Sequence, residues 1–161
     1  MRQRLLGMAT FTLLTCAALA TPAYAQYDYG VRAGISGQPD QVFLGVHLDT
    51  PSLGHVTTFR PNVEVGFGGN TSRFGSDVIL LTVNLELVHW MPLPNTPWKL
   101  YAGGGAGANF LHNGDANLFN NGLTPGVNVV FGLQHEKGLF AEITSGIQPN
   151  VKIAVGYVLK K

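Results

Sequence analysis

Cysteine is almost absent from this chain of 161 residues, since the only one, Cys16, lies in an apolar N-terminal segment. The remainder of the chain can therefore form no internal disulfide. Charge is also scarce: Asp, Glu, Lys and Arg make up 12% of the residues, about half the usual share in soluble domains. Beyond the N-terminal segment the basic and acidic residues nearly balance, which gives no indication of a nucleic-acid partner.

Long apolar runs are missing beyond residue 25, so no stretch there could form a membrane-spanning helix of roughly 20 residues. Residues 1–25 themselves have the marks of a signal peptide: arginines near the start, a short apolar run, and the A-x-A site Ala23-Tyr24-Ala25. We expect export and cleavage after Ala25, which leaves residues 26–161 as one domain. Lipid attachment at Cys16 is the alternative.

The remaining chain shows a two-residue alternation of apolar and polar side chains. It is clearest at 59–67, where Phe, Pro, Val, Val and Phe alternate with Arg, Asn, Glu and Gly. Successive side chains of a strand point to opposite faces, so each such segment has one apolar and one polar face. Turn residues separate the segments. The pattern predicts eight strands, at 27–36, 41–50, 58–69, 78–91, 98–112, 123–136, 139–147 and 151–160.

The two faces differ sharply in composition. The apolar face of four of the strands consists of Val42, Leu44, Val46, Leu48, Leu81, Val83, Leu85, Leu87, Val127, Val129, Phe131, Leu133, Val151, Ile153, Val155, Tyr157 and Leu159. The polar face contains Arg32, Asp49, Arg60, Asn62, Glu64, Thr82, Asn84, Glu86, Lys99, Tyr101, Asn109, Asn128, Gln134, Glu142, Thr144 and Lys152, with ten glycines at Gly30, Gly34, Gly45, Gly66, Gly103, Gly105, Gly107, Gly132, Gly146 and Gly156.

Alternation alone does not decide which face is inside, because soluble barrels bury the apolar face and membrane barrels turn it to lipid. The glycines favour a polar interior, where they would make room for Arg, Lys and Tyr side chains. Trp98 and Phe110 lie on one face, at opposite ends of their strand, as in two aromatic girdles. Trp90 and Trp98 lie on either side of the Pro92–Pro97 turn, so Trp90 is a further girdle candidate.

Two local expectations follow from the polar face and the strand pattern. Inside a barrel, Arg32 or Arg60 should pair across strands with Glu64 or Glu86, because buried charges need partners. Pro61 cannot donate to a strand ladder, so a bulge or a strand end is expected near it.

Several motifs could carry chemistry, but each has a simpler structural interpretation. The segment 103–108 contains a loose G-x-G-x-x-A, yet the residues after it continue a strand, whereas a dinucleotide site needs a helix there. His47 and Asp49 share a face and could ligate a metal, or could form a hydrogen-bonded pair near a barrel rim. Asp115, with Asn113 and Asn117, could bind calcium or simply form a loop.

Small membrane barrels that hydrolyse or transfer lipid acyl groups need a serine placed against a histidine. The chain offers no H-x-S pair on one strand face, although pairs across strands or in the turn at Ser52 and His55 remain open. We therefore predict no enzyme, and assign no catalytic, cofactor-binding or metal-binding residue.

Several stretches resemble the small bacterial outer-membrane β-barrel proteins, of the eight-stranded OmpA/OmpX-like or opacity-protein-like kind, including the uncharacterised outer membrane protein beta-barrel domain family. They are Pro39-Asp40-Gln41, 44–49, 59–68, Asn84-Leu85-Glu86 and 101–105. The resemblance implies a fold and a compartment but no catalytic residues. Such proteins commonly end in an aromatic residue, whereas this chain ends in Lys160-Lys161, which leaves insertion into the membrane open.

We therefore predict an all-β protein, an eight-stranded antiparallel up-and-down transmembrane barrel in the bacterial outer membrane. Its partners would be outer-membrane lipid and an extracellular partner bound by the 112–122 loop, the longest of the loops near 37–40, 69–77, 112–122 and 147–150. A filled barrel of this size has no open pore, so the role would be structural or surface interaction. The alternatives are a soluble periplasmic or secreted lipocalin-like barrel holding an apolar ligand, and a lipid-modifying outer-membrane enzyme.

Overall fold

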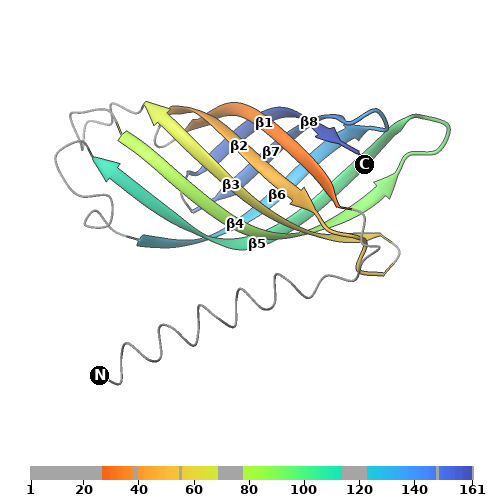
Figure 1. Cartoon of the computed structure of the whole chain (residues 1–161), viewed down its shortest axis with the longest axis horizontal. Helices are drawn as coiled ribbons and strands as arrows, with labels where there is room; N and C mark the ends of the chain where they lie inside the picture. The colour runs from red at the N-terminus through yellow and green to blue at the C-terminus, as the bar shows by residue number, and fades with distance from the viewer. Residues whose placement is uncertain are drawn as a thin grey trace, which may run out of the picture.

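The computed structural model describes residues 27–37, 40–54, 56–68, 78–113, 123–147 and 149–160, with only the backbone of Val78, His112 and Asn113. Eight strands form one closed antiparallel barrel in which each strand pairs with the next (Figure 1). They are β1 (Asp28–Gly37), β2 (Gln41–Asp49), β3 (Thr57–Gly68), β4 (Val78–Pro92), β5 (Trp98–Asn113), β6 (Leu123–His135), β7 (Leu139–Gly146) and β8 (Val151–Leu159). The predicted fold is confirmed, and every strand boundary lies within one residue of its prediction.

The barrel closes where β1 pairs with β8, from Tyr29 opposite Leu159 to Gly37 opposite Val151. Closure leaves no unpaired sheet edge. The up-and-down order gives the barrel two distinct ends. We call the end where β1 begins and β8 ends the terminal end. The opposite end, where β1 ends and β8 begins, is the far end (Figure 1). Residues 1–26 lie outside the described residues, so cleavage after Ala25 stays a prediction.

The apolar face is on the outside of the barrel. Leu44 and Phe131 are 59% and 61% exposed, whereas Arg60 and Glu86 are each 1% exposed in the interior. Apolar side chains from all eight strands cover the outer surface. The predicted division into two faces is confirmed, and the polar face is the interior one.

Interior glycines make room for large interior side chains. A Cβ atom on Gly132 would lie 2.0 Å from Cζ of Tyr101, and one on Gly30 would lie 2.0 Å from Cε1 of His47. Both distances are far below any van der Waals contact. The glycines of the polar face thus let bulky residues on neighbouring strands cross the narrow lumen, as predicted for Tyr.

Trp90 is not part of an outer girdle, contrary to the prediction. It points inward, and its ring packs against Tyr101 with centroids 5.0 Å apart. Together with Val88 and Val130, which are fully buried, these rings form a small apolar layer across the lumen. The parity of β4 explains the error, because Trp90 lies an even number of residues after Glu86 and therefore shares its inward face. Trp98 and Phe110 do lie on the outer face of β5.

Pro61 neither bulges nor ends β3. The register of β3 with β4 runs unbroken through it, with Pro61 opposite Leu85. Pairing with β2 stops at Asn62 opposite His47, and resumes in the same register where Thr50 N donates to Phe59 O at 3.0 Å. The amide groups of alternate residues point to the same neighbour, so the missing N–H of Pro61 faces β2. The proline therefore interrupts one ladder without shifting it.

Candidate functional site

The middle of the lumen holds a network of ion pairs between strands that are not sequence neighbours. Arg32 on β1 lies 3.4 Å from Glu64 on β3 and donates a hydrogen bond to Glu142 on β7. Lys152 on β8 donates to the other oxygen of Glu64. All four side chains are at most 8% exposed. Because such charges are stable inside a protein only when paired, this network holds opposite walls of the barrel together.

Arg60 forms the second half of the network, nearer the terminal end. Its guanidinium donates to both carboxylate oxygens of Asp49, at 2.6 and 3.1 Å. Glu142 lies 3.7 Å from the same guanidinium and accepts a hydrogen bond of 2.8 Å from the Tyr101 hydroxyl. Arg60 also lies over the rings of Tyr101 and Trp90, 4.9 and 5.4 Å from their centroids. The lumen is closed here by a charged and aromatic layer.

The predicted arginine–glutamate pairing is confirmed by Arg32 with Glu64, whereas Arg60 pairs with Asp49 instead. Arg60 and Glu86 are direct partners in the register of β3 and β4, yet Arg60 reaches Asp49 on the other side. Glu86 instead accepts a hydrogen bond of 2.9 Å from the amide of Asn128 on β6. Asp49 offers Arg60 a bidentate partner, which is the stronger arrangement for a guanidinium.

His47 and Asp49 do not form the expected hydrogen-bonded pair. His47 Nε2 is 3.8 Å from Asp49 Oδ2, too long for a hydrogen bond, and the buried imidazole packs edge-on against Phe140. Both oxygens of Asp49 already accept from Arg60. In the part of the chain that is described, no group of three His, Cys, Asp or Glu residues could hold a metal. The calcium candidate Asp115 lies outside the described residues.

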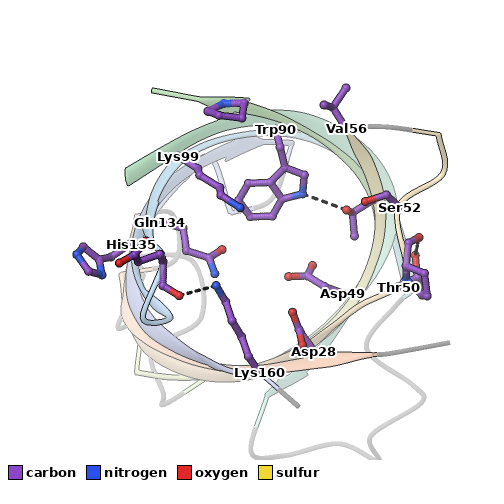
Figure 2. Close-up of a pocket in the computed structure, with 14 residues that line it drawn as sticks. Asp28, Asp49, Thr50, Ser52, Val56, Trp90, Lys99, Gln134, His135 and Lys160 are labelled. Atoms are coloured by element: carbon purple, nitrogen blue, oxygen red, sulfur yellow. Dashed lines mark hydrogen bonds between the residues drawn. The ribbon is translucent and has the colours of Figure 1, made fainter. Parts of the chain in front are cut away.

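A cavity of about 600 Å³ opens at the terminal end, above the charged layer. Figure 2 shows the mouth with Trp90 and Lys99 on one side and Asp49 and Asp28 on the other. The indole Nε1 of Trp90 donates to the hydroxyl of Thr58 at 3.0 Å. The full lining is Asp28, Asp49, Thr50, Pro51, Ser52, Val56, Thr58, Trp90, Pro92, Lys99, Gln134, His135, Glu136 and Lys160.

The alternation does not predict this cavity. It predicts only that Lys99 and Gln134 lie on the polar face, and the two residues are direct partners between β5 and β6. Nothing in the alternation indicates that the lumen is filled in the middle and empty at this end. The only available signal was a change of residue type toward the strand ends, where long polar side chains give way to turn residues.

Another, much smaller cavity lies toward the far end of the lumen. This cavity of about 20 Å³, the size of a single water molecule, is lined by amides and hydroxyls, among them Asn84, Asn109 and Thr144. It shares no lining residue with the larger cavity. The G-x-G-x-x-A segment at 103–108 lies within β5, so the strand continues past it as predicted. Gly103, Gly105 and Gly107 share the inward parity of Tyr101, whereas Ala106 faces outward and is exposed.

The described serines and histidines are occupied elsewhere or lie apart. The Ser145 hydroxyl donates to the carbonyl of Asn150, and the ring of His89 hydrogen-bonds Thr57 on the outer surface. Figure 2 shows Ser52 and His135 on opposite sides of the cavity mouth. The candidate turn partner His55 lies outside the described residues.

Two solved structures share this fold. The outer membrane enzyme PagL matches with a TM-score of 0.55 and 15% sequence identity, over 83% of this chain and 99% of its own. The N-terminal β-barrel domain of Pseudomonas aeruginosa OprF matches with a TM-score of 0.50 and 13% identity, over 84% of this chain and 99% of its own. No protein-family model and no curated protein matches the sequence. The likeness shows the small outer membrane barrel fold, and a fold alone carries no activity.

Proposed function

We propose that this protein is an integral outer-membrane β-barrel with a structural or surface-interaction role and no open pore. The observation that carries the proposal is the inverted distribution of side chains. Apolar residues such as Ile35, Leu44 and Phe131 are about 60% exposed around the outside, while Arg60 and Glu142 are buried within. Such a surface is stable against acyl chains and unfavourable in water. The barrel folds of PagL and OprF support the same compartment.

Aromatic residues at both ends of the outer surface also support a membrane position. Tyr29, Trp98 and Tyr157 face outward near the terminal end, and Phe67 and Phe110 do so near the far end. Aromatic rings favour the two interfaces between lipid and water. Among the described residues no helix is long and apolar enough to cross a membrane. The terminal end, with its short turns, would face the periplasm, and the far end would face outward.

A soluble lipocalin-like barrel fits the structure poorly. Such a barrel holds its apolar ligand in an apolar lumen. Here the lumen contains Arg32, Arg60, Glu64 and Glu142, all paired and all nearly inaccessible to solvent. The cavity at the terminal end is also lined largely by charged and polar side chains, so the lumen offers an apolar ligand no favourable environment.

A structural or interaction role is favoured over catalysis and over transport of solutes. The charged layer around Arg60 separates two cavities that have no lining residue in common, which blocks a path along the axis. PagL is an enzyme by its description, but the described serines and histidines of this chain are not assembled into a nucleophile and base. Loop segments at the far end, including 112–122, would provide the contact surface.

Fractionation of expressing cells combined with conductance measurements tests this proposal. The protein should remain with outer membranes after alkaline washing and should need detergent for release. In planar bilayers it should give no steady single-channel conductance. Recovery of the folded protein in the soluble periplasmic fraction would contradict the membrane assignment, and a stable conductance would contradict the closed lumen.

A further inference from the structure

The cavity at the terminal end contains an acceptor and a cation that the protein itself does not use. Gln134 is 6% exposed, and its Oε1 atom has no hydrogen-bond partner within the described part of the chain. Figure 2 shows its amide turned toward the centre of the cavity. Lys99 lines the same cavity and has no interaction partner among the described residues. A buried acceptor without a donor is unfavourable, so a ligand that supplies an N–H would be stabilised here.

The spacing of these two groups restricts the ligand. Lys99 and Gln134 are directly opposite each other on β5 and β6, and both point inward. Side chains so placed have Cβ atoms about 5 Å apart, so a flexible lysine and a glutamine here can reach two neighbouring groups of one ligand. The C-terminal residue of a peptide carries its carboxylate and its amide N–H on one Cα, so it presents an anion and a donor next to each other. The Lys99 ammonium suits the carboxylate, and Gln134 Oε1 suits the N–H.

The rest of the cavity is consistent with that ligand. Asp49 is paired with Arg60, so its charge is already balanced, and Lys160 holds one of its N–H groups on the carbonyl of Glu136. The indole of Trp90 gives the wall an apolar surface for a side chain. A volume of about 600 Å³ lies within the range of small-ligand sites and accommodates several peptide residues.

We propose that this cavity binds the free C-terminus of a peptide, with the carboxylate on Lys99, the last amide N–H on Gln134 Oε1 and the last side chain against Trp90. A free amino acid shares the carboxylate but has an ammonium group in place of the amide. That ammonium would lie beside Lys99 and be repelled by it, so the site should prefer the peptide.

Fluorescence of Trp90 gives a direct test. The chain has two tryptophans, so a Trp98→Phe variant leaves Trp90 as the only reporter. The folded protein in detergent micelles is titrated with acetyl-Ala-Ala-Leu as the free acid, with the same peptide as its C-terminal amide, and with free leucine. We expect a saturable change with the acid. Binding should be weaker by about tenfold or more for the amide, which loses the charge-assisted contact with Lys99, and for leucine, whose ammonium group is repelled by Lys99.

Matched variants assign the effect to the two residues. Lys99→Gln should abolish the preference for acid over amide, and Gln134→Leu should weaken both peptides to a similar extent. Lys137→Gln is the control, because it removes one exposed lysine at the same end of the barrel but outside the cavity. Equal affinity for acid and amide in the unsubstituted site, or no saturable change up to about 10 mM peptide, would overturn the proposal. So would an undiminished preference in Lys99→Gln.

Discussion

At the scale of single residues, Glu142 is the centre of the interior network. It accepts from Arg32 and from the Tyr101 hydroxyl, and it lies 3.7 Å from Arg60. Glu142 lies on β7, and its negative charge balances the guanidinium charges of Arg32 on β1 and Arg60 on β3. Glu86 is equally buried, but its one hydrogen-bond donor among the described residues is the neutral amide of Asn128. Two glutamates on the same interior face should thus differ greatly in their contribution to stability.

Glu142→Gln should lower the free energy of unfolding by on the order of 3–5 kcal/mol, because it leaves two buried guanidinium groups short of a counter-charge. Glu86→Gln should cost less than half as much, since the glutamine keeps the oxygen that accepts from Asn128. Urea unfolding in lipid vesicles measures both. Equal unfolding midpoints for the two variants would show that the ion pairs do not organise the lumen.

Gly132→Ala should destabilise the barrel by roughly 1–3 kcal/mol, because the new Cβ would lie 2.0 Å from Tyr101 Cζ and force that ring to move. Gly126→Ala on the same strand is the matched control. The nearest atom to its new Cβ would be Asn109 Nδ2 at 3.2 Å, so a small shift suffices. In a Tyr101→Ala background the added cost of Gly132→Ala should largely vanish. Equal costs at the two glycines in the same unfolding assay would contradict this account.

At the scale of elements, β3 combines a continuous ladder on one side with an interrupted ladder on the other. Its pairing with β4 includes Pro61, while its pairing with β2 lacks the hydrogen bond that the residue at this position would donate. The bond from Thr50 to Phe59 keeps the two strands in register beyond the gap. The interruption lies toward the terminal end, near the cavity wall that β2 and β3 form.

Pro61→Thr should restore the missing donor without changing the register. The new amide should be protected from hydrogen exchange, because it would face the carbonyl of Leu48 on β2. The unfolding midpoint should change little, since the added hydrogen bond is offset by the greater freedom of the unfolded chain. Amide exchange followed by NMR measures the protection. A rapidly exchanging amide at position 61 would mean that the strands separate here for another reason.

At the scale of the whole molecule, the sequence determines the faces but not the contacts across the lumen. The two-residue alternation of apolar and polar side chains predicts Leu85 on one face and Asn84 on the other, and the turn residues predict the limits of all eight strands. The partners of Arg60 and Glu142 depend on which strands face each other after closure, and that is a property of the barrel rather than of any one strand. The aromatic ring of Trp90 and its place before a turn are typical of a girdle residue, but its parity in β4 turns it inward. The cavity depends on side-chain lengths at the strand ends, which alternation does not report.

The central claim is that the apolar face of this barrel contacts lipid, and two adjacent residues of β4 test it directly. Leu85 is 53% exposed on the outside and Asn84 is 6% exposed in the lumen. Single cysteines replace each in a Cys16→Ser background, which removes the only native thiol whether or not residues 1–25 are cleaved.

A fluorophore on Leu85→Cys in vesicles should be quenched strongly by a lipid-borne nitroxide, because that position faces acyl chains. Asn84→Cys should react slowly with a charged maleimide, because its neighbours fill the lumen. Leu53→Cys, in an exposed turn at the terminal end, is the control for rapid aqueous labelling. Fast aqueous labelling at position 84, together with no lipid quenching at position 85, would contradict the membrane barrel.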